Sequence, residues 1–296
     1  MRFEVINAGR EAIGSPDIRA IVAQEVLLLA VDYVVYYEGQ NQFGVHDLLK
    51  HVRVDGESTP SRPPTSVCTD LHQADAAAAT WLDASAGASA TARRLRRIVG
   101  IYDDLPEPPK PAQRVELPAG IDEAAPDLAR ARELLQLGQI LPDLDAMHAA
   151  CAAAGARFVM CSFDRLCHDG LRLDLKEGHS IYAHLNHDYW PLSYATIRRL
   201  ADLQNRCFEA WAKAHGAPFL PVAAHVPQDP LLFTDSVHAT ELGSRLRAWV
   251  ICSELLPLVA ADLRRGAVPV PDTQRDAERP FRAPARHVTA AELDRR

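Results

Sequence analysis

The stretch that decides the fold is Val34-Val35-Tyr36-Tyr37-Glu38-Gly39-Gln40-Asn41-Gln42-Phe43. Its apolar half is rich in β-branched and aromatic residues, which is typical of a strand covered on both faces. Gly39 permits a tight turn after the strand, and Asn41 follows with an amide that both donates and accepts hydrogen bonds. Open α/β sheets bind ligands beyond the carboxyl ends of their strands, so Asn41 is a candidate ligand-binding residue. An ordinary Gly/Asn turn is the alternative interpretation.

The segments on either side of this stretch repeat an α/β pattern. Phe3 to Asn7 has the composition of a short strand, and residues 17–29 carry apolar side chains at helical spacing. With the strand at Asp32 to Tyr37, they form a βαβ unit if both strands are parallel. The alternation resumes with a helix at 144–154, a strand at 156–163, a helix at 193–215, an edge strand at 218–222 and a helix at 240–263. We therefore expect an α/β fold with a parallel sheet.

Two regions fall outside this pattern. The weak periodicity after Phe43 and the prolines at 105–111 predict that residues 44–142 form an insertion or a lid over one end of the sheet. Residues 165–192 are predicted to be a long polar loop. We expect residues 1–265 to form a single domain and residues 266–296 to be a poorly ordered tail.

The composition argues against several classes of function. The net charge of −7 and the lack of a long basic run argue against nucleic-acid binding. Six cysteines without a CxxC motif, mostly in apolar surroundings, favour buried free thiols over disulfides or a zinc site. His179, His184 and His187 are interpreted as part of the polar loop, with metal binding as the alternative. No apolar run approaches the length of a membrane-spanning helix.

A late segment, Phe233 to Gly243, carries the clearest chemical signal. Asp235 and His238 are three residues apart in a turn that leads into a helix. This spacing brings a carboxylate to one imidazole nitrogen and leaves the other nitrogen to act as a general base. The same spacing occurs at Asp145 and His148, but within a predicted helix, where we expect only a surface pair.

Three segments in this order resemble the SGNH (GDSL-like) hydrolases: Asn7-Ala8-Gly9 with Ser15, then Asp32 to Asn41, then Phe233 to Gly243. The resemblance covers residues 3–43 and about 156–263. It implies a three-layer, flavodoxin-like fold and the activity of an esterase or acyl-transfer enzyme. The substrate would be a small-molecule, glycan or lipid ester, and neither a metal nor another cofactor is implied.

The resemblance also implies roles for individual residues. Asp235 and His238 match the acid and the base of the family. Gly39 and Asn41 match the block that supplies an oxyanion-hole amide. The backbone N–H of Ala12 matches a further oxyanion donor, with Gly9 or Gly14 as alternatives.

The nucleophilic serine of the family has no counterpart in this sequence. In the family it follows a first strand that lies upstream of the strand expected at Phe3, and Ser15, Ser162 and Ser236 do not match its motif. That first strand would lie between the strands at 3–7 and 32–37, so we expect both to lack a partner on that side. We therefore expect the nucleophile block to lie upstream of Met1 and the chain to be inactive without it. A shortened, non-catalytic relative that binds a ligand or partner is the alternative.

Overall fold

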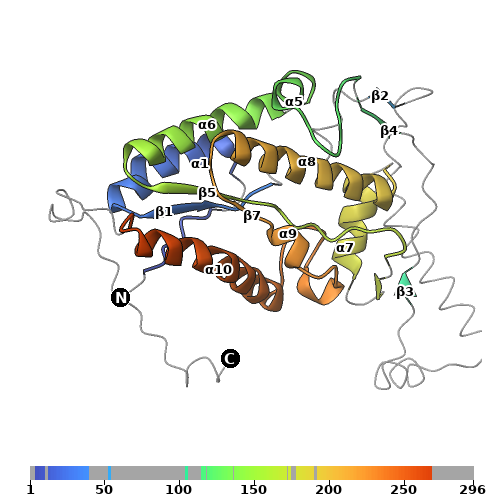
Figure 1. The fold of residues 1–296 in the computed structure, drawn as a ribbon. Coiled ribbons are helices and arrows are strands. Elements are labelled where there is room, and N and C mark those ends of the chain that lie inside the picture. The colour runs from blue at the N-terminus through green and yellow to red at the C-terminus, as the bar shows by residue number, and fades with distance from the viewer. Residues whose placement is uncertain are drawn as a thin grey trace, which may run out of the picture.

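A computed structural model describes residues 4–10, 13–39, 53–54, 104–105, 115–117, 119–135, 137–171, 173–174, 178–189 and 192–268. A parallel sheet at its centre consists of β1 (Tyr33–Tyr36), β5 (Arg157–Cys161) and β7 (Phe219–Leu220), in the order β1-β5-β7. Tyr33 lies opposite Arg157, and Met160 lies opposite Phe219. The predicted α/β class and the position of β7 at a sheet edge are confirmed (Figure 1).

Helices cover both faces of this sheet. α1 (Ser15–Ile21), α6 (Leu137–Ala153) and α8 (Tyr194–Ala214) lie on one face, and α10 (Glu241–Arg264) lies on the other (Figure 1). The side chains of β1 alternate accordingly, as the pleat of a strand requires. Tyr36 is buried with its ring centroid 5.9 Å from that of Phe158. Tyr33 points the other way and donates a 2.6 Å hydrogen bond to Asp262 of α10.

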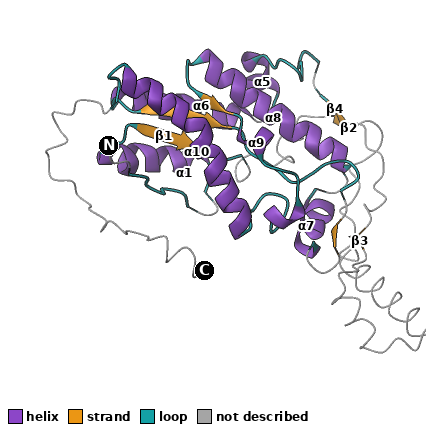
Figure 2. Cartoon of the chain, turned by 60° about the horizontal axis from the view of Figure 1, so that its bottom comes forward, coloured by secondary structure: helices purple, strands orange, loops and turns teal. Residues whose placement is uncertain are grey.

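The remaining elements are short (Figure 2). α1 continues as a single helical run through η1 (Val22–Val26) and η2 (Leu27–Leu29). β2 (Arg53–Val54) pairs antiparallel with β4 (Val115–Glu116), and β3 (Asp104–Leu105) pairs antiparallel with β6 (Leu173–Asp174). The others are α5 (Leu128–Leu134), α7 (His179–Ala183), η3 (His184–Asp188), α9 (Val222–His225) and η4 (Pro230–Leu232).

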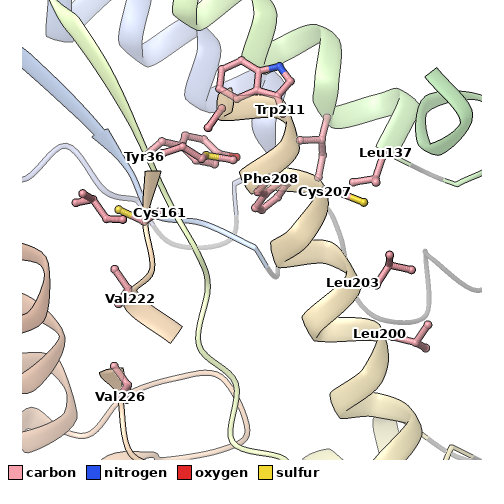
Figure 3. Packing of buried hydrophobic residues seen from close by; sticks show 14 of the residues in the cluster. Tyr36, Leu137, Cys161, Leu200, Leu203, Cys207, Phe208, Trp211, Val222 and Val226 are labelled. Carbon is pink, nitrogen blue, oxygen red and sulfur yellow. The ribbon is translucent and has the colours of Figure 1, made fainter. Parts of the chain in front are cut away.

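α8 and α10 begin where the sequence predicts because polar side chains cap them. Ser193 Oγ accepts the N–H of Thr196 at the start of α8, and Thr240 Oγ1 accepts the N–H of Gly243 at the start of α10. α8 is strongly amphipathic and lines the core with residues that recur every three or four positions (Figure 3). These residues are Leu200, Leu203, Cys207, Phe208 and Trp211, each at most 1% exposed.

The predicted strand at Phe3 to Asn7 is wrong for the residues that the structure describes. Residues 4–10 form no strand, and Val5 is 94% exposed. The segment is attached instead by Arg10, which donates two hydrogen bonds of 2.8 and 2.7 Å to the Glu25 carboxylate. The physical reason is that a strand needs a neighbour to hydrogen-bond with. Within the described chain β1 pairs only with β5, so no strand lies between β1 and residues 4–7 for that segment to pair with.

Two further boundaries need correction. Residues 165–192 are not simply a polar loop, because β6, α7 and η3 lie within them and Ile181, Leu185 and Tyr189 are at most 1% exposed. The predicted insertion also ends too late, since α6 already begins at Leu137 and packs into the core before Pro142. Most of residues 44–118 and the tail from 269 lie outside the described residues.

The predicted surface pair of Asp145 and His148 is also wrong. Asp145 instead accepts hydrogen bonds from Trp211 Nε1 and Arg132 Nη2, both at 2.8 Å. The His148 ring packs edge-on against Trp211 and His215, at centroid distances of 5.9 and 5.7 Å. Both side chains contact Trp211 of α8 and other residues outside their own helix, which the spacing within α6 does not reveal.

The cysteines largely follow the prediction. Among the described residues, Cys151, Cys161, Cys167 and Cys207 are free and buried. Cys252 is free but exposed, because it lies on the outward face of α10.

A buried ion pair ties α10 to the sheet. The Asp164 carboxylate is fully buried just beyond β5 and accepts hydrogen bonds from Arg247 Nε at 3.0 Å and Nη2 at 2.8 Å. The Tyr37 hydroxyl, just beyond β1, donates to the same carboxylate. Burial and the adjacent Asp164 charge raise the pKa of Tyr37 well above its usual value, so this hydroxyl remains a donor.

Replacing Arg247 with Met should destabilise the fold strongly. The change leaves the buried Asp164 carboxylate without its cation, and we expect the free energy of unfolding to fall by about 3–5 kcal/mol. Urea unfolding followed by circular dichroism measures it. Arg245→Met is the matched control on the same helix: its pair with Glu241 is exposed, so we expect a loss below about 1 kcal/mol. Equal losses in the two variants would contradict the role given to Arg247.

His148 should make the fold sensitive to mild acid. Burial, and then the nearby His215, lower the pKa of His148 below 6.5 in the folded state. Below about pH 6.5 the unfolded chain therefore takes up a proton that the folded chain does not, and stability falls. His148→Phe keeps an aromatic ring but cannot titrate. We expect its thermal midpoint to drop less than that of the wild type between about pH 7.5 and pH 5.5; an equal drop would exclude His148 as the source.

Candidate functional site

The turn at 233–240 is a compact loop closed by its own backbone. Phe233 and Ala239 form an antiparallel bridge, and the N–H of Thr234 donates to the His238 carbonyl at 2.8 Å. Thr240 then caps α10. The loop therefore has little freedom to rearrange between its two ends.

Asp235 and His238 are in direct contact within this turn. Asp235 Oδ2 lies 2.6 Å from His238 Nδ1. Asp235 Oδ1 accepts the backbone N–H groups of Val237 and His238, each at 2.8 Å. One carboxylate oxygen thus fixes the turn and the other orients the imidazole, which places a proton on Nδ1 and leaves Nε2 as the basic nitrogen. The His238 side chain is 71% exposed, so a reacting group can reach it.

The environment keeps Asp235 ionised. Burial alone would raise its pKa, but the hydrogen bonds from the backbone of His238 and Val237 and from the His238 ring oppose this. Their combined effect lowers the pKa of Asp235 well below its ordinary value. A carboxylate that stays charged can stabilise an imidazolium beside it, as the acid of a catalytic pair must.

Contacts with neighbouring segments hold the turn at the carboxyl edge of the sheet. The N–H of Leu166, shortly after β5, donates to the Ser236 carbonyl at 2.9 Å. Arg247 Nη2 donates to the Val237 carbonyl at 3.0 Å while also binding Asp164. Because Tyr37 binds the same Asp164, the turn is connected through two side chains to the end of β1.

Gly39 lies at this edge too. Its carbonyl accepts a 2.9 Å hydrogen bond from Gln204 Nε2, and a Cβ atom at this position would lie 2.6 Å from Cβ of Phe163. Glycine is therefore required here by close packing against the segment after β5. The other two predicted oxyanion donors, Asn41 and Ala12, lie outside the described residues.

The serines weighed as nucleophiles are all buried. Ser15 donates to Asp143 at 2.5 Å, Ser162 Oγ accepts the N–H of Ala223 at 2.9 Å, and Ser236 is 0% exposed beside His184. Each is hydrogen-bonded within the fold, which favours a structural role for all three.

His184 is a residue of the site that the sequence did not indicate. It reaches the turn from η3, and its Nδ1 lies 2.9 Å from Ser236 Oγ. The signal was its place in a histidine-rich segment, which was interpreted as part of a polar loop with metal binding as the alternative. Among the residues that the structure describes, no cluster of three or more His, Cys, Asp or Glu side chains is arranged to hold a metal.

A cavity of about 250 Å³ lies at the opposite edge of the sheet. The amino ends of β5 and β7 and the end of α10 form it, with Arg157, Pro218 and Asp262 among the residues that line it. Neither Asp235 nor His238 contributes to it, so it is distinct from the Asp–His pair.

Comparison with known proteins adds no relative. No protein-family model matches this sequence, and no match was found among curated proteins or solved structures. In the described part of the chain, no helix is long and apolar enough to span a membrane.

Gly243 sets how closely α10 approaches the loop before the turn. A Cβ atom at this position would lie 2.0 Å from the carbonyl oxygen of Leu232. We therefore expect Gly243→Ala to lower the free energy of unfolding by about 1–3 kcal/mol, because backbone must move to relieve the clash. Ser244→Ala, at the exposed neighbouring position, should change stability by less than about 0.5 kcal/mol. Chemical denaturation of both variants decides the point, and a stable Gly243→Ala would contradict the predicted close contact.

Proposed function

We propose that this chain carries the acid–base half of an SGNH-type serine ester hydrolase or acyl-transfer enzyme. The observation that supports the proposal best is the 2.6 Å contact between Asp235 Oδ2 and His238 Nδ1, on a turn at the carboxyl edge of a parallel sheet. Ligands of such sheets bind at this edge. The finer fold in this proposal is the three-layer, flavodoxin-like arrangement of that family.

In the proposed reaction, His238 Nε2 takes the proton of a serine hydroxyl as the serine oxygen attacks an ester carbonyl. Asp235 stabilises the imidazolium, which then protonates the departing alcohol. Gly39, Asn41 and the N–H of Ala12 are the proposed oxyanion donors, and loss of one such donor typically costs about 3–4 kcal/mol of transition-state stabilisation. Water completes a hydrolysis, whereas an alcohol acceptor completes an acyl transfer. The substrate is a small-molecule, glycan or lipid ester.

The serine is proposed to come from an additional parallel strand beside β1. Two observations support this placement: β1 is at the edge of the described sheet, and Val5 is 94% exposed in the segment where a strand was expected. A strand at this edge would satisfy the outer backbone groups of β1. It would also end at the same carboxyl edge as Asp235.

A non-catalytic binding protein is the second candidate. The burial of Ser15, Ser162 and Ser236 favours it, because none of these hydroxyls is accessible to a substrate. In that case the carboxyl edge of the sheet would bind a ligand or partner without turning it over.

The test is hydrolysis of p-nitrophenyl acetate by the protein extended with the coding sequence upstream of Met1. We expect turnover by the extended protein, none above background by the 296-residue chain, and a fall in kcat of at least about 10³-fold in extended His238→Ala. His225→Ala is the matched control, since His225 is 51% exposed and pairs with Glu254 on a different part of the surface. Unchanged turnover in His238→Ala would exclude His238 as the base. A stop codon directly upstream of Met1 would exclude the upstream serine and favour the non-catalytic binding protein.

A further inference from the structure

His184 contacts the segment that carries Asp235 from outside the turn. It lies 52 residues earlier in the chain, at the start of η3, and its side chain is 17% exposed. Its Nδ1 is 2.9 Å from Ser236 Oγ, 3.2 Å from Ser236 N and 3.6 Å from Asp235 Oδ1. A single ring nitrogen therefore contacts both the N–H and the hydroxyl of Ser236, the residue that follows the acid.

The direction of these hydrogen bonds follows from the donors. A backbone N–H can only donate, so the contact with Ser236 N makes Nδ1 of His184 an acceptor. In this arrangement the proton of a neutral His184 lies on Nε2. Ser236 is 0% exposed, so its N–H and hydroxyl cannot turn to water if His184 is lost.

The ring of His184 is itself held in place. It packs against the ring of Tyr189 with centroids 5.1 Å apart, and Tyr189 is 1% exposed. Arg165 lies over the same tyrosine ring, 5.4 Å from its centroid, and donates to its hydroxyl. The ring that meets Ser236 is therefore backed by a buried layer of side chains.

The bonds within the turn do not by themselves fix its orientation. Asp235 Oδ1 accepts the N–H groups of Val237 and His238, which move with the turn. Leu166 and Arg247 hold the carbonyl groups of Ser236 and Val237, and His184 holds the N–H of Ser236 from η3. His184 is thus the side chain that accepts the backbone N–H of Ser236, directly after Asp235.

We propose that His184 is a positioning residue for the acid–base pair: by holding Ser236, it keeps Asp235 Oδ2 aligned with His238 Nδ1. The inference rests on the proposed function for its catalytic meaning, but the alignment itself is a property of the folded chain. His184 acts through Ser236 and Asp235, without touching the reacting groups.

The test compares two amide variants in the 296-residue chain. In His184→Asn the amide is as many bonds from Cβ as Nδ1, so its oxygen can still accept from Ser236. In His184→Gln the amide sits one bond further out, where Nε2 was. The readout is the tautomer of the His238 ring, obtained from its ¹⁵N chemical shifts at a pH where the ring is neutral, because the Asp235 contact selects the Nδ1–H form.

We expect the Nδ1–H to Nε2–H ratio of His238 to fall at least about twofold in His184→Gln, which corresponds to the lower end of the net contribution of a hydrogen bond. We expect His184→Asn to retain the wild-type ratio. His168→Gln should also leave it unchanged, since His168 Nδ1 contacts the carbonyl of Asp169 and not the turn. An unchanged ratio in His184→Gln overturns the proposal, and so does loss of folding in both variants, which would show a purely structural role.

The outcomes separate this inference from the proposed function. A tautomer shift in His184→Gln together with an inactive extended protein would uphold the positioning role and refute the enzyme. Turnover by the extended protein with no tautomer shift would support the enzyme and refute the positioning role. If both hold, His184→Gln in the extended protein should lower kcat about 10-fold while KM stays unchanged, because alignment of the base matters only in the transition state.

Discussion

The buried ion pair between Asp164 and Arg247 is the interaction on which the arrangement at the carboxyl edge depends. A carboxylate this deeply buried is tolerated only when a cation neutralises its charge and hydrogen bonds satisfy its oxygens. Arg247 of α10 supplies the cation, and Tyr37 at the end of β1 donates a further hydrogen bond. α10 and the ends of β1 and β5 therefore converge on Asp164. Such a pair adds little net stability compared with apolar packing, but here it joins α10 to the ends of β1 and β5.

The same arginine extends this constraint to the turn through the Val237 carbonyl. Chemistry at Asp235 and His238 would require the turn to be held in place, because positioning errors of about 1 Å lower rates severely. The local bonds of the turn set the distance between the two side chains. Leu166, Arg247 and His184 set where that pair points relative to the sheet. Local geometry and placement thus come from different parts of the chain.

This division explains what the sequence could and could not predict. β1, β5, α8 and α10 were predictable because their periodicity and capping residues are local, and the contact of Asp235 with His238 was predictable from its three-residue spacing. The strand at 3–7 was not, since a strand forms only with a neighbour to pair with, and the sequence of that segment says nothing about the neighbour. The contact of His184 with Ser236 and that of Asp145 with Trp211 join side chains 52 and 66 residues apart. The histidines around Ile181 and Leu185 also made residues 165–192 look like a polar loop, although the segment contains a helix with a buried face.

The position of β1 at the edge of the described sheet has a consequence for how the protein behaves in solution. Its sequence, Tyr-Val-Val-Tyr, has high β propensity and carries no charge. Natural sheets protect such edges with charges, prolines, bulges or covering segments, because an unprotected edge templates pairing with other chains. Among the described residues no strand pairs with this side of β1, so it could pair with a strand of this chain or of another. Both the solubility of the protein and the completion of its sheet would then depend on what pairs with β1.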